Sequence, residues 1–305
     1  MREVVQITFF ALGTVNTITI PGCSRKDILQ TAKDRVLELD DRLSVFKEDS
    51  EISQINQAAG RGFVKVHSDT FYLIQAAVHF SALTEGVFDI TACPMVALWG
   101  IGKKNAWIPS QEEISRMRSL VDYRDILMDE TACTVMLKQH GQAIDLGSIA
   151  KGYAADEVRR ILLENSVTEA LINLGGTVVA IGPPCTLGIQ HPMKETGIPM
   201  GRLTMTNMAA VTSGSNEKYF IKDGVRYHHI LDPRTGCPAH SGLLSITLIG
   251  ESAMALDALT TAVFILGMQK GITLIKQFQF QAVFITDTLD VFTTDGLKNR
   301  FSFTA

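Results

Sequence analysis

Residues 4–21 read VVQITFFALGTVNTITIP, and this stretch separates two kinds of fold. It contains no charged residue, so a membrane-spanning helix is one interpretation. A spanning helix needs about 20 predominantly apolar residues, whereas polar residues and a glycine interrupt this run. Its β-branched and aromatic residues instead predict two strands joined near Leu12-Gly13. We therefore expect a β-hairpin here and no transmembrane segment.

The same stretch allows a second alternative, a lipoprotein processing site at Ile20-Pro21-Gly22-Cys23. Its apolar region would be poor, and Pro21 stands where a small residue is expected. We therefore expect a cytoplasmic protein. A periplasmic or membrane-anchored protein would need an export signal that this sequence does not show.

Further along the chain, strands and helices do not alternate regularly. Ser24 is expected to begin a long amphipathic helix in which apolar residues recur at helical spacing as far as Leu43. Runs of strands with inserted helices favour an α+β fold with an antiparallel sheet. No linker or charge block divides the chain. The other expected elements are helices at 50–56, 68–84, 111–120, 145–164, 252–266 and 270–278, and strands at 63–66, 126–137, 170–181, 243–249 and on both sides of 287–289.

Composition and missing motifs exclude several classes of protein. Among 305 residues, 28 Lys and Arg stand against 32 Asp and Glu, which argues against nucleic-acid binding through bulk charge. The five cysteines are widely spaced and fit neither a zinc cage nor a disulfide framework, so they are expected to be thiols. The chain has no P-loop and no H-E-x-x-H motif. The S-x-x-K spacing of Ser–Lys acyl-transfer enzymes occurs three times without its companion motifs, so it carries little information.

A first candidate site lies at Asp145, Ser148 and Lys151, which share one face at an expected helix start. The free N–H groups and positive dipole end of a helix N-terminus suit a phosphate, and Gly147 allows close backbone approach. A helix cap followed by ordinary surface residues explains the pattern equally well.

A second candidate is the pair Asp257 and Thr261, four residues apart in an otherwise apolar helix. A buried carboxylate is costly unless it is paired or bound to a metal ion. Together the two side chains offer hard oxygens of the kind that Mg²⁺ takes, alongside phosphate and water. A capped or back-bonded polar pair is the alternative.

The third candidate is His229, just before Asp232-Pro233-Arg234-Thr235-Gly236. Asp-Pro-x-x-Gly is by itself a turn signature. A histidine beside this turn could perform acid–base chemistry, although a lone histidine more often packs or hydrogen-bonds.

These patches, in this order, resemble the ApbE family of flavin transferases over nearly the whole chain. The segments that carry the resemblance are Leu12-Gly13-Thr14, Ser44-Val45-Phe46, Phe88-Asp89-Ile90-Thr91, residues 145–156, Asn173-Leu174-Gly175-Gly176, Thr212-Ser213-Gly214, residues 229–236 and residues 257–262. Position 12 departs from the family's usual Met, which keeps an apolar contact and loses the thioether.

The resemblance implies an ApbE-like α+β fold with a T-fold-related antiparallel sheet core and inserted helices. We expect one such domain over residues 1–305, either undivided or as two closely packed subdomains with the FAD cleft between them. The implied activity is Mg²⁺-dependent transfer of FMN from FAD to a Ser or Thr hydroxyl, with a phosphoester as product and AMP released. The implied FAD contacts are Leu12, Phe46, Val87, Phe88, Asp89, Asp145, Lys151 and Leu231.

The metal would be held by Ser148, through its carbonyl, together with Asp257 and Thr261. His229 is the candidate base, with Asp257 or a metal-bound water as rivals. The implied partner is a flavoprotein of a redox or respiratory complex with the segment Asp-Gly-x-[Ser/Thr]-Gly-Ala-Thr, which this chain lacks. Two alternatives stay open: an FAD pyrophosphatase that yields FMN and AMP, and a passive FAD-binding protein.

Overall fold

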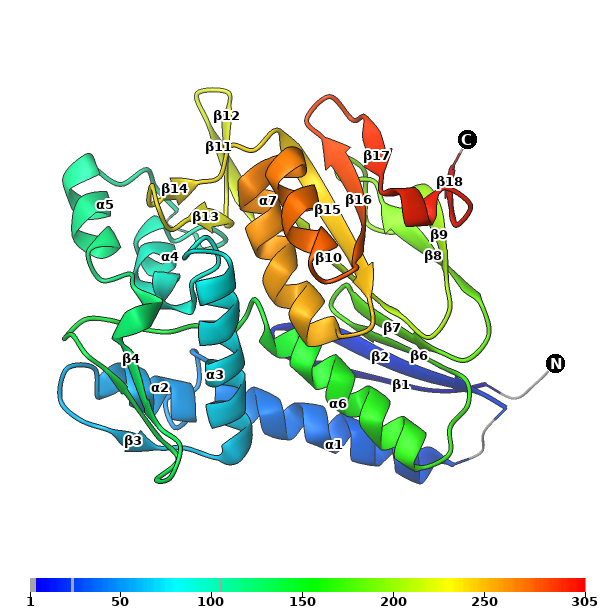
Figure 1. Ribbon diagram of the computed structural model, residues 1–305, viewed down its shortest axis with the longest axis horizontal. Coiled ribbons are helices and arrows are strands. Elements are labelled where there is room, and N and C mark those ends of the chain that lie inside the picture. The colour runs from blue at the N-terminus through cyan, green and yellow to red at the C-terminus, as the bar shows by residue number, and fades with distance from the viewer. Residues whose placement is uncertain (1–3, 23–24, 105, 305) are drawn as a thin grey trace.

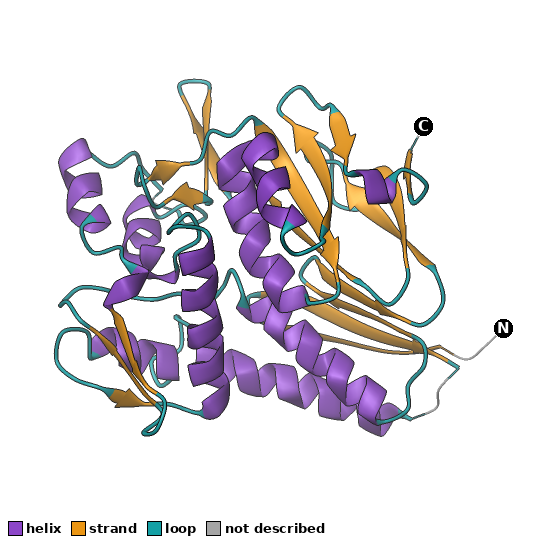
Figure 2. Ribbon diagram, in the orientation of Figure 1, coloured by secondary structure: helices purple, strands orange, loops and turns teal. Residues whose placement is uncertain are grey.

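The computed structural model describes residues 4–22, 25–104 and 106–304. Its centre is a fully antiparallel sheet, as the sequence predicts (Figures 1 and 2). The eight strands are, in spatial order, β1 (Val4–Ala11), β2 (Thr14–Pro21), β6 (Ala170–Leu174), β7 (Thr177–Ile181), β10 (Ala209–Gly214), β15 (Leu243–Gly250), β16 (Gln281–Thr286) and β17 (Val291–Thr293). The predicted hairpin at residues 4–21 is confirmed as β1 and β2, paired in register from Val4 opposite Pro21 to Ala11 opposite Thr14.

Helices cover one face of this sheet, and a smaller sheet covers the other. Figure 1 shows α1, α6 and α7 lying against the sheet, with α3 beside them. The helices are α1 (Lys26–Leu43), α2 (Glu51–Gln57), α3 (Ser68–Leu83), α4 (Cys93–Trp99), α5 (Gln111–Arg118), α6 (Ala150–Glu164) and α7 (Ala253–Lys276), with short 3-10 helices η1 (Ile90–Ala92), η2 (Tyr123–Asp125) and η3 (Asp295–Leu297). The remaining strands are β8 (Cys185–Gln190), β9 (Pro199–Met205) and β18 (Phe301–Phe303) in one sheet, β3 (Val64–Lys65), β4 (Ile126–Asp129) and β5 (Thr134–Leu137) in another, and the pairs β11 (Tyr219–Lys222) with β12 (Val225–His228) and β13 (Leu231–Asp232) with β14 (Cys237–Pro238).

Local sequence explains most helix boundaries. The buried residues of α1 follow the predicted helical spacing, while its predicted first residue, Ser24, lies outside the described residues, as does Cys23 of the lipoprotein alternative. Ser50 caps α2 by accepting the Ser53 N–H, as predicted. Helix α4 is an addition to the predicted elements, with a proline in its first turn.

Helix α7 is the most apolar element. Gly267 interrupts it with φ 77° and ψ 175°, so two helical segments follow one another, as the sequence predicts. Among the described residues, α7 alone is long and apolar enough to cross a membrane, and 61% of the relevant window is buried inside the protein. Such burial is typical of the core helix of a folded domain.

Candidate functional site

The N-terminal turn of α6 meets the first half of α7, and this junction brings two of the predicted patches together. The Asp257 carboxylate is 4% exposed, and its Oδ2 accepts the Gly152 N–H at 2.9 Å. A Cβ on Gly152 would lie 2.3 Å from the Ala253 carbonyl oxygen, so only glycine allows the helices this approach.

The same hydrogen bond leaves the Ser148 carbonyl available. In a continuous helix the N–H of Gly152 would donate to the carbonyl four residues earlier, that of Ser148. Here it donates to Asp257 instead, and among the described residues no hydrogen bond reaches the Ser148 oxygen. An accessible carbonyl without a donor is a ready ligand for a hard cation.

Thr261 adds a third oxygen from the same face of α7 as Asp257, one turn further along. It is half-buried, and its hydroxyl takes part in no hydrogen bond with the described residues. Among the described residues no group of three His, Cys, Asp or Glu side chains could hold a metal. A set made of one carboxylate, one hydroxyl and one carbonyl fits Mg²⁺, which accepts oxygen donors of all three kinds.

Lys151 supplies the positive charge of the junction. Its Nζ donates to the Gly147 carbonyl at 3.0 Å and lies 3.5 Å from Asp257 Oδ1. The lysine side chain is 24% exposed and that of Asp257 6% exposed, so the ammonium faces solvent from the rim of the site. A cation in this position can pair with a phosphate oxygen.

His229 lies within electrostatic reach of Lys151, at the end of β12. Its Nδ1 is 3.3 Å from the Lys218 carbonyl, which can only accept, so the neutral ring carries its proton on Nδ1 and leaves Nε2 as a base. Burial lowers the pKa of His229 to about 4, and the Lys218 and Lys151 charges act in the same direction. The imidazole is therefore neutral at pH 7.

The neighbouring His228 has a structural role. Its Nε2 donates to the Ala239 carbonyl at 2.9 Å, and its ring packs edge-on against Phe264 with centroids 5.4 Å apart. The side chain is 5% exposed. Of the two histidines, His229 is thus the one whose free nitrogen faces the junction's charges.

Glu217 is a residue that the sequence analysis missed. Burial raises the pKa of its carboxyl, the Asp257 charge raises it further, and the Lys151 and Lys218 charges oppose both. The segment that carries it joins β10 to β11, where Ser213 Oγ donates to Thr260 Oγ1 of α7 at 3.0 Å. No motif points to a carboxylate in this connection, so only the fold could place it beside Lys151.

Asp145 and Asp89 lie side by side before α6. The Asp145 N–H donates to the Ile90 carbonyl at 3.0 Å, and Asp145 Oδ1 accepts the Gly147 N–H at 2.8 Å. Asp89 accepts from the Thr91 N–H and hydroxyl and from the Tyr123 N–H, at 2.8, 2.6 and 3.0 Å. Burial raises the pKa of Asp89. Its carboxylate therefore fixes the loop that carries Asp145.

Leu12 and Phe46 are linked through Asp40. The Leu12 N–H donates to Asp40 Oδ1 at 2.8 Å, and the other Asp40 oxygen pairs with Lys47, next to Phe46. Leu12 has φ 53°, which holds the β1–β2 turn in a left-handed conformation. Phe46 is 82% exposed, an unusual degree of exposure for a phenyl ring and one that a ligand contact would explain.

The three other predicted FAD contacts are buried in apolar clusters. Val87 and Phe88 belong to the main core and are 4% and 1% exposed. Leu231 is 6% exposed and packs in the cluster that contains Trp99. A ligand contact at these positions would come from the backbone, because the side chains support the fold.

Two polar anchors fix α6 and α7. The Tyr153 hydroxyl donates to Asp69 Oδ1 at 2.9 Å, and Arg35 bridges Asp69 and Glu157 at 2.8 and 2.9 Å. Asp156 accepts both first N–H groups of α7, at 3.0 Å each. The junction is thus held from α1, α3 and the start of α7.

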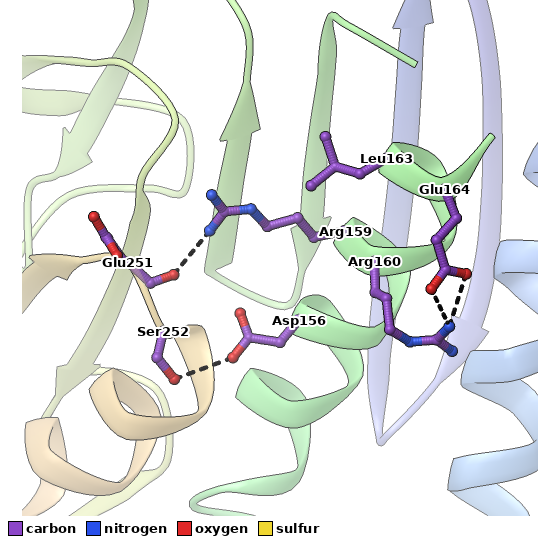
Figure 3. A pocket seen from close by; sticks show the side chains of 7 residues that line it. All are labelled: Asp156, Arg159, Arg160, Leu163, Glu164, Glu251 and Ser252. Atoms are coloured by element: carbon purple, nitrogen blue, oxygen red, sulfur yellow. Dashed lines mark hydrogen bonds and ion pairs between the residues drawn. The ribbon is translucent and has the colours of Figure 1, made fainter. Parts of the chain in front are cut away.

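The surface hollow in Figure 3 lies further along α6, and none of the predicted site residues lines it. Its volume is about 440 Å³, and Arg159 crosses it to donate to the Glu251 carbonyl at 2.9 Å. A second hollow, of about 250 Å³, lies between residues 20–28 and 165–169. The candidate site therefore rests on the side chains of the junction.

Known proteins resemble this chain along most of its length. A sequence model described as "ApbE family" matches residues 12–284. The FAD:protein FMN transferase of Klebsiella pneumoniae (strain 342) is 39% identical over 264 residues, 86% of this chain and 83% of that one. The crystal structure of the ApbE protein from Thermotoga maritima is 33% identical, with TM-score 0.90 over 98% of this chain and 99% of that one. The flavin transferase ApbE from Vibrio cholerae is 25% identical, with TM-score 0.87 over 98% and 100% of the two chains.

The α+β fold and these relatives define the protein as a transferase, which confirms the predicted fold class and the prediction that it is an enzyme. More particularly, the chain belongs to the ApbE family, as its motifs predict.

Proposed function

We propose that this protein transfers FMN from FAD to a Ser or Thr hydroxyl of an acceptor protein, forming a phosphoester and releasing AMP. Its relatives carry the name FAD:protein FMN transferase. The observation that carries the proposal for this chain is the α6–α7 junction, where Ser148, Asp257 and Thr261 offer three oxygens beside the Lys151 ammonium.

In this proposal Asp257 Oδ1, the Thr261 hydroxyl and the Ser148 carbonyl would hold Mg²⁺. A bound Mg²⁺ supplies charge neutralisation to a pyrophosphate that is being split. Asp257 Oδ2 stays with the Gly152 N–H and fixes the orientation of the carboxylate.

Lys151 binds a phosphate oxygen of FAD and stabilises the charge that develops when the pyrophosphate breaks. Asp145 lies on the loop before α6 and helps position the same ligand. The exposed Phe46 and the nearby Leu12 would contact a ring of FAD, and the backbone at Val87, Phe88, Asp89 and Leu231 would complete the site.

His229 acts as the base. Its Nε2 takes the proton of the acceptor hydroxyl, whose oxygen attacks the phosphorus of the FMN half of FAD. The P–O bond to the AMP half breaks, and AMP leaves with the electron pair. The hydrogen bond from Nδ1 to the Lys218 carbonyl holds the required tautomer.

The acceptor is proposed to be a redox flavoprotein with an Asp-Gly-x-[Ser/Thr]-Gly-Ala-Thr segment. In this chain Asp223-Gly224 is followed by Val225, and Asp295-Gly296 by Leu297, so neither site continues as the segment requires. The protein is therefore not expected to label itself there.

One assay separates transfer from its alternatives. Protein, FAD, Mg²⁺ and a carrier domain with the acceptor segment are mixed, and covalent flavin fluorescence on a denaturing gel is read together with AMP release. Transfer gives both signals in equal amounts. AMP and free FMN without labelled carrier would indicate a pyrophosphatase, and neither product would indicate a passive FAD-binding protein.

A further inference from the structure

The hairpin formed by β11 and β12 projects from the body of the protein directly beside His229 (Figure 1). Its strands pair from Tyr219 opposite His228 to Lys222 opposite Val225, and they join through Asp223-Gly224, both with positive φ. Among the described residues these two strands form a sheet of their own. Each strand therefore has an outer edge without a neighbouring strand.

The register shows which backbone groups lie on those edges. The His229 N–H donates to the Lys218 carbonyl at 3.1 Å, so the pair 218 and 229 is hydrogen-bonded. Hydrogen-bonded and non-bonded pairs alternate in an antiparallel ladder. Tyr219 and Ile221 therefore direct their N–H and C=O groups away from β12, and no hydrogen bond with the described residues satisfies these groups.

The β11 edge is accessible, whereas the β12 edge is obstructed. Tyr219 is 42% exposed and Ile221 61% exposed. On β12, the corresponding His228 is 5% exposed and packs against Phe264. An exposed edge with apolar side chains is a template for a further strand.

The edge is also held rigidly. The rings of Phe220 and Tyr227 stack with centroids 5.1 Å apart, and Tyr227 stacks on Trp99 at 5.8 Å. Trp99 in turn donates to the Gly236 carbonyl at 2.8 Å. A preformed edge loses little entropy when a peptide binds to it.

We propose that β11 binds the acceptor protein as an added β-strand, through the outward backbone groups of Tyr219 and Ile221. This inference rests on the proposed function, because that reaction needs a protein hydroxyl at His229. Main-chain pairing supplies affinity in such complexes, and the exposed Ile221 side chain adds an apolar contact. The register advances about 3.3 Å per residue, so an acceptor residue roughly 10 Å along the strand from the one opposite Ile221 reaches the level of Lys218 and His229.

The test uses Ile221→Pro, which removes the outward N–H while the ladder to β12 is kept. Ile221→Thr is the matched control, because it shortens the apolar side chain and keeps the N–H. With a carrier domain that has the acceptor segment, the proline variant is expected to raise the acceptor KM about tenfold and the threonine variant no more than about threefold. The KM for FAD and the AMP released without acceptor stay as in the wild type.

Amide hydrogen exchange of the unaltered protein gives a second measurement. A saturating carrier domain is expected to slow exchange at Tyr219 and Ile221 at least tenfold. Unchanged exchange there, or an acceptor KM of Ile221→Pro within twofold of the wild type, overturns the docking proposal alone. If the unaltered protein releases AMP and labels no carrier, both the proposed function and the docking proposal are overturned.

Discussion

Asp257 performs two tasks, and two substitutions separate them. The Asp257→Ala variant removes the acceptor of the Gly152 N–H together with the proposed metal ligand. The Asp257→Asn variant keeps an oxygen for Gly152 and loses the negative charge. Both are therefore expected to abolish Mg²⁺-dependent FMN transfer, while only the alanine variant is expected to weaken the fold.

The magnitudes follow from the contacts at the junction. An unsatisfied buried N–H costs about 1–3 kcal/mol, so Asp257→Ala should lower the free energy of unfolding by about 2 kcal/mol. The Lys151 contact is long, at 3.5 Å, and the ammonium can turn to solvent. Its loss in Asp257→Asn should cost less than about 1 kcal/mol. A lost metal ligand removes several kcal/mol of transition-state stabilisation, equivalent to a rate reduction of about a thousandfold.

Urea unfolding measured by tryptophan fluorescence gives the stabilities, and covalent flavin fluorescence with AMP release across a Mg²⁺ titration gives the activities. Glu112→Gln, an exposed carboxylate of α5, is the charge-matched control and should change neither. Equal stabilities of the two Asp257 variants would refute the role of the Gly152 hydrogen bond. An Asp257→Asn variant with wild-type turnover and Mg²⁺ dependence would refute the metal site.

Three further predictions concern the same junction. His229→Ala should lower the transfer rate by about 10²–10³, and the wild-type rate should fall on the acid side with an apparent pKa of about 4; because the folded-state pKa lies below the unfolded value, the stability that the neutral ring contributes is complete above about pH 6.5, declines as the pH falls toward 4, and is absent from His229→Gln in acid unfolding curves. Lys151→Met should raise the KM for FAD by about ten- to a hundredfold with little change in stability, which flavin titration and urea unfolding can check. Gly152→Ala, whose Cβ would meet the Ala253 carbonyl, should lower the free energy of unfolding by about 1–3 kcal/mol, whereas Gly62→Ala, with open space around it, should stay within about 0.5 kcal/mol in the same assay.

Local patterns were sufficient for the elements whose signals are local. Alternating apolar and polar residues placed β1 and β2, and Ser50 marked the start of α2. The end of the apolar run at Leu266 anticipated the interruption of α7 at Gly267. The spacing of Asp257 and Thr261 placed both on one face of that helix, because a helix brings residues four apart together.

Tertiary features needed the fold. Gly152 and Asp257 are 105 residues apart in sequence, and no local pattern pairs them. The motif at Val87-Phe88 resembles a flavin contact, although burial assigns those side chains to the core. Glu217 belongs to no motif and is placed beside Lys151 only by the path of the chain between β10 and β11.

Packing and ligand chemistry at the junction are a single event. Because Gly152 has no side chain, α6 approaches α7 closely enough for Asp257 to take the Gly152 N–H. The Ser148 carbonyl then loses the donor that a regular helix would give it, so the contact that joins the helices also provides an oxygen of the proposed metal site. A side chain at position 152 should therefore weaken Mg²⁺-dependent transfer by more than its effect on stability explains, since it separates Asp257 from Ser148 before it unfolds the protein.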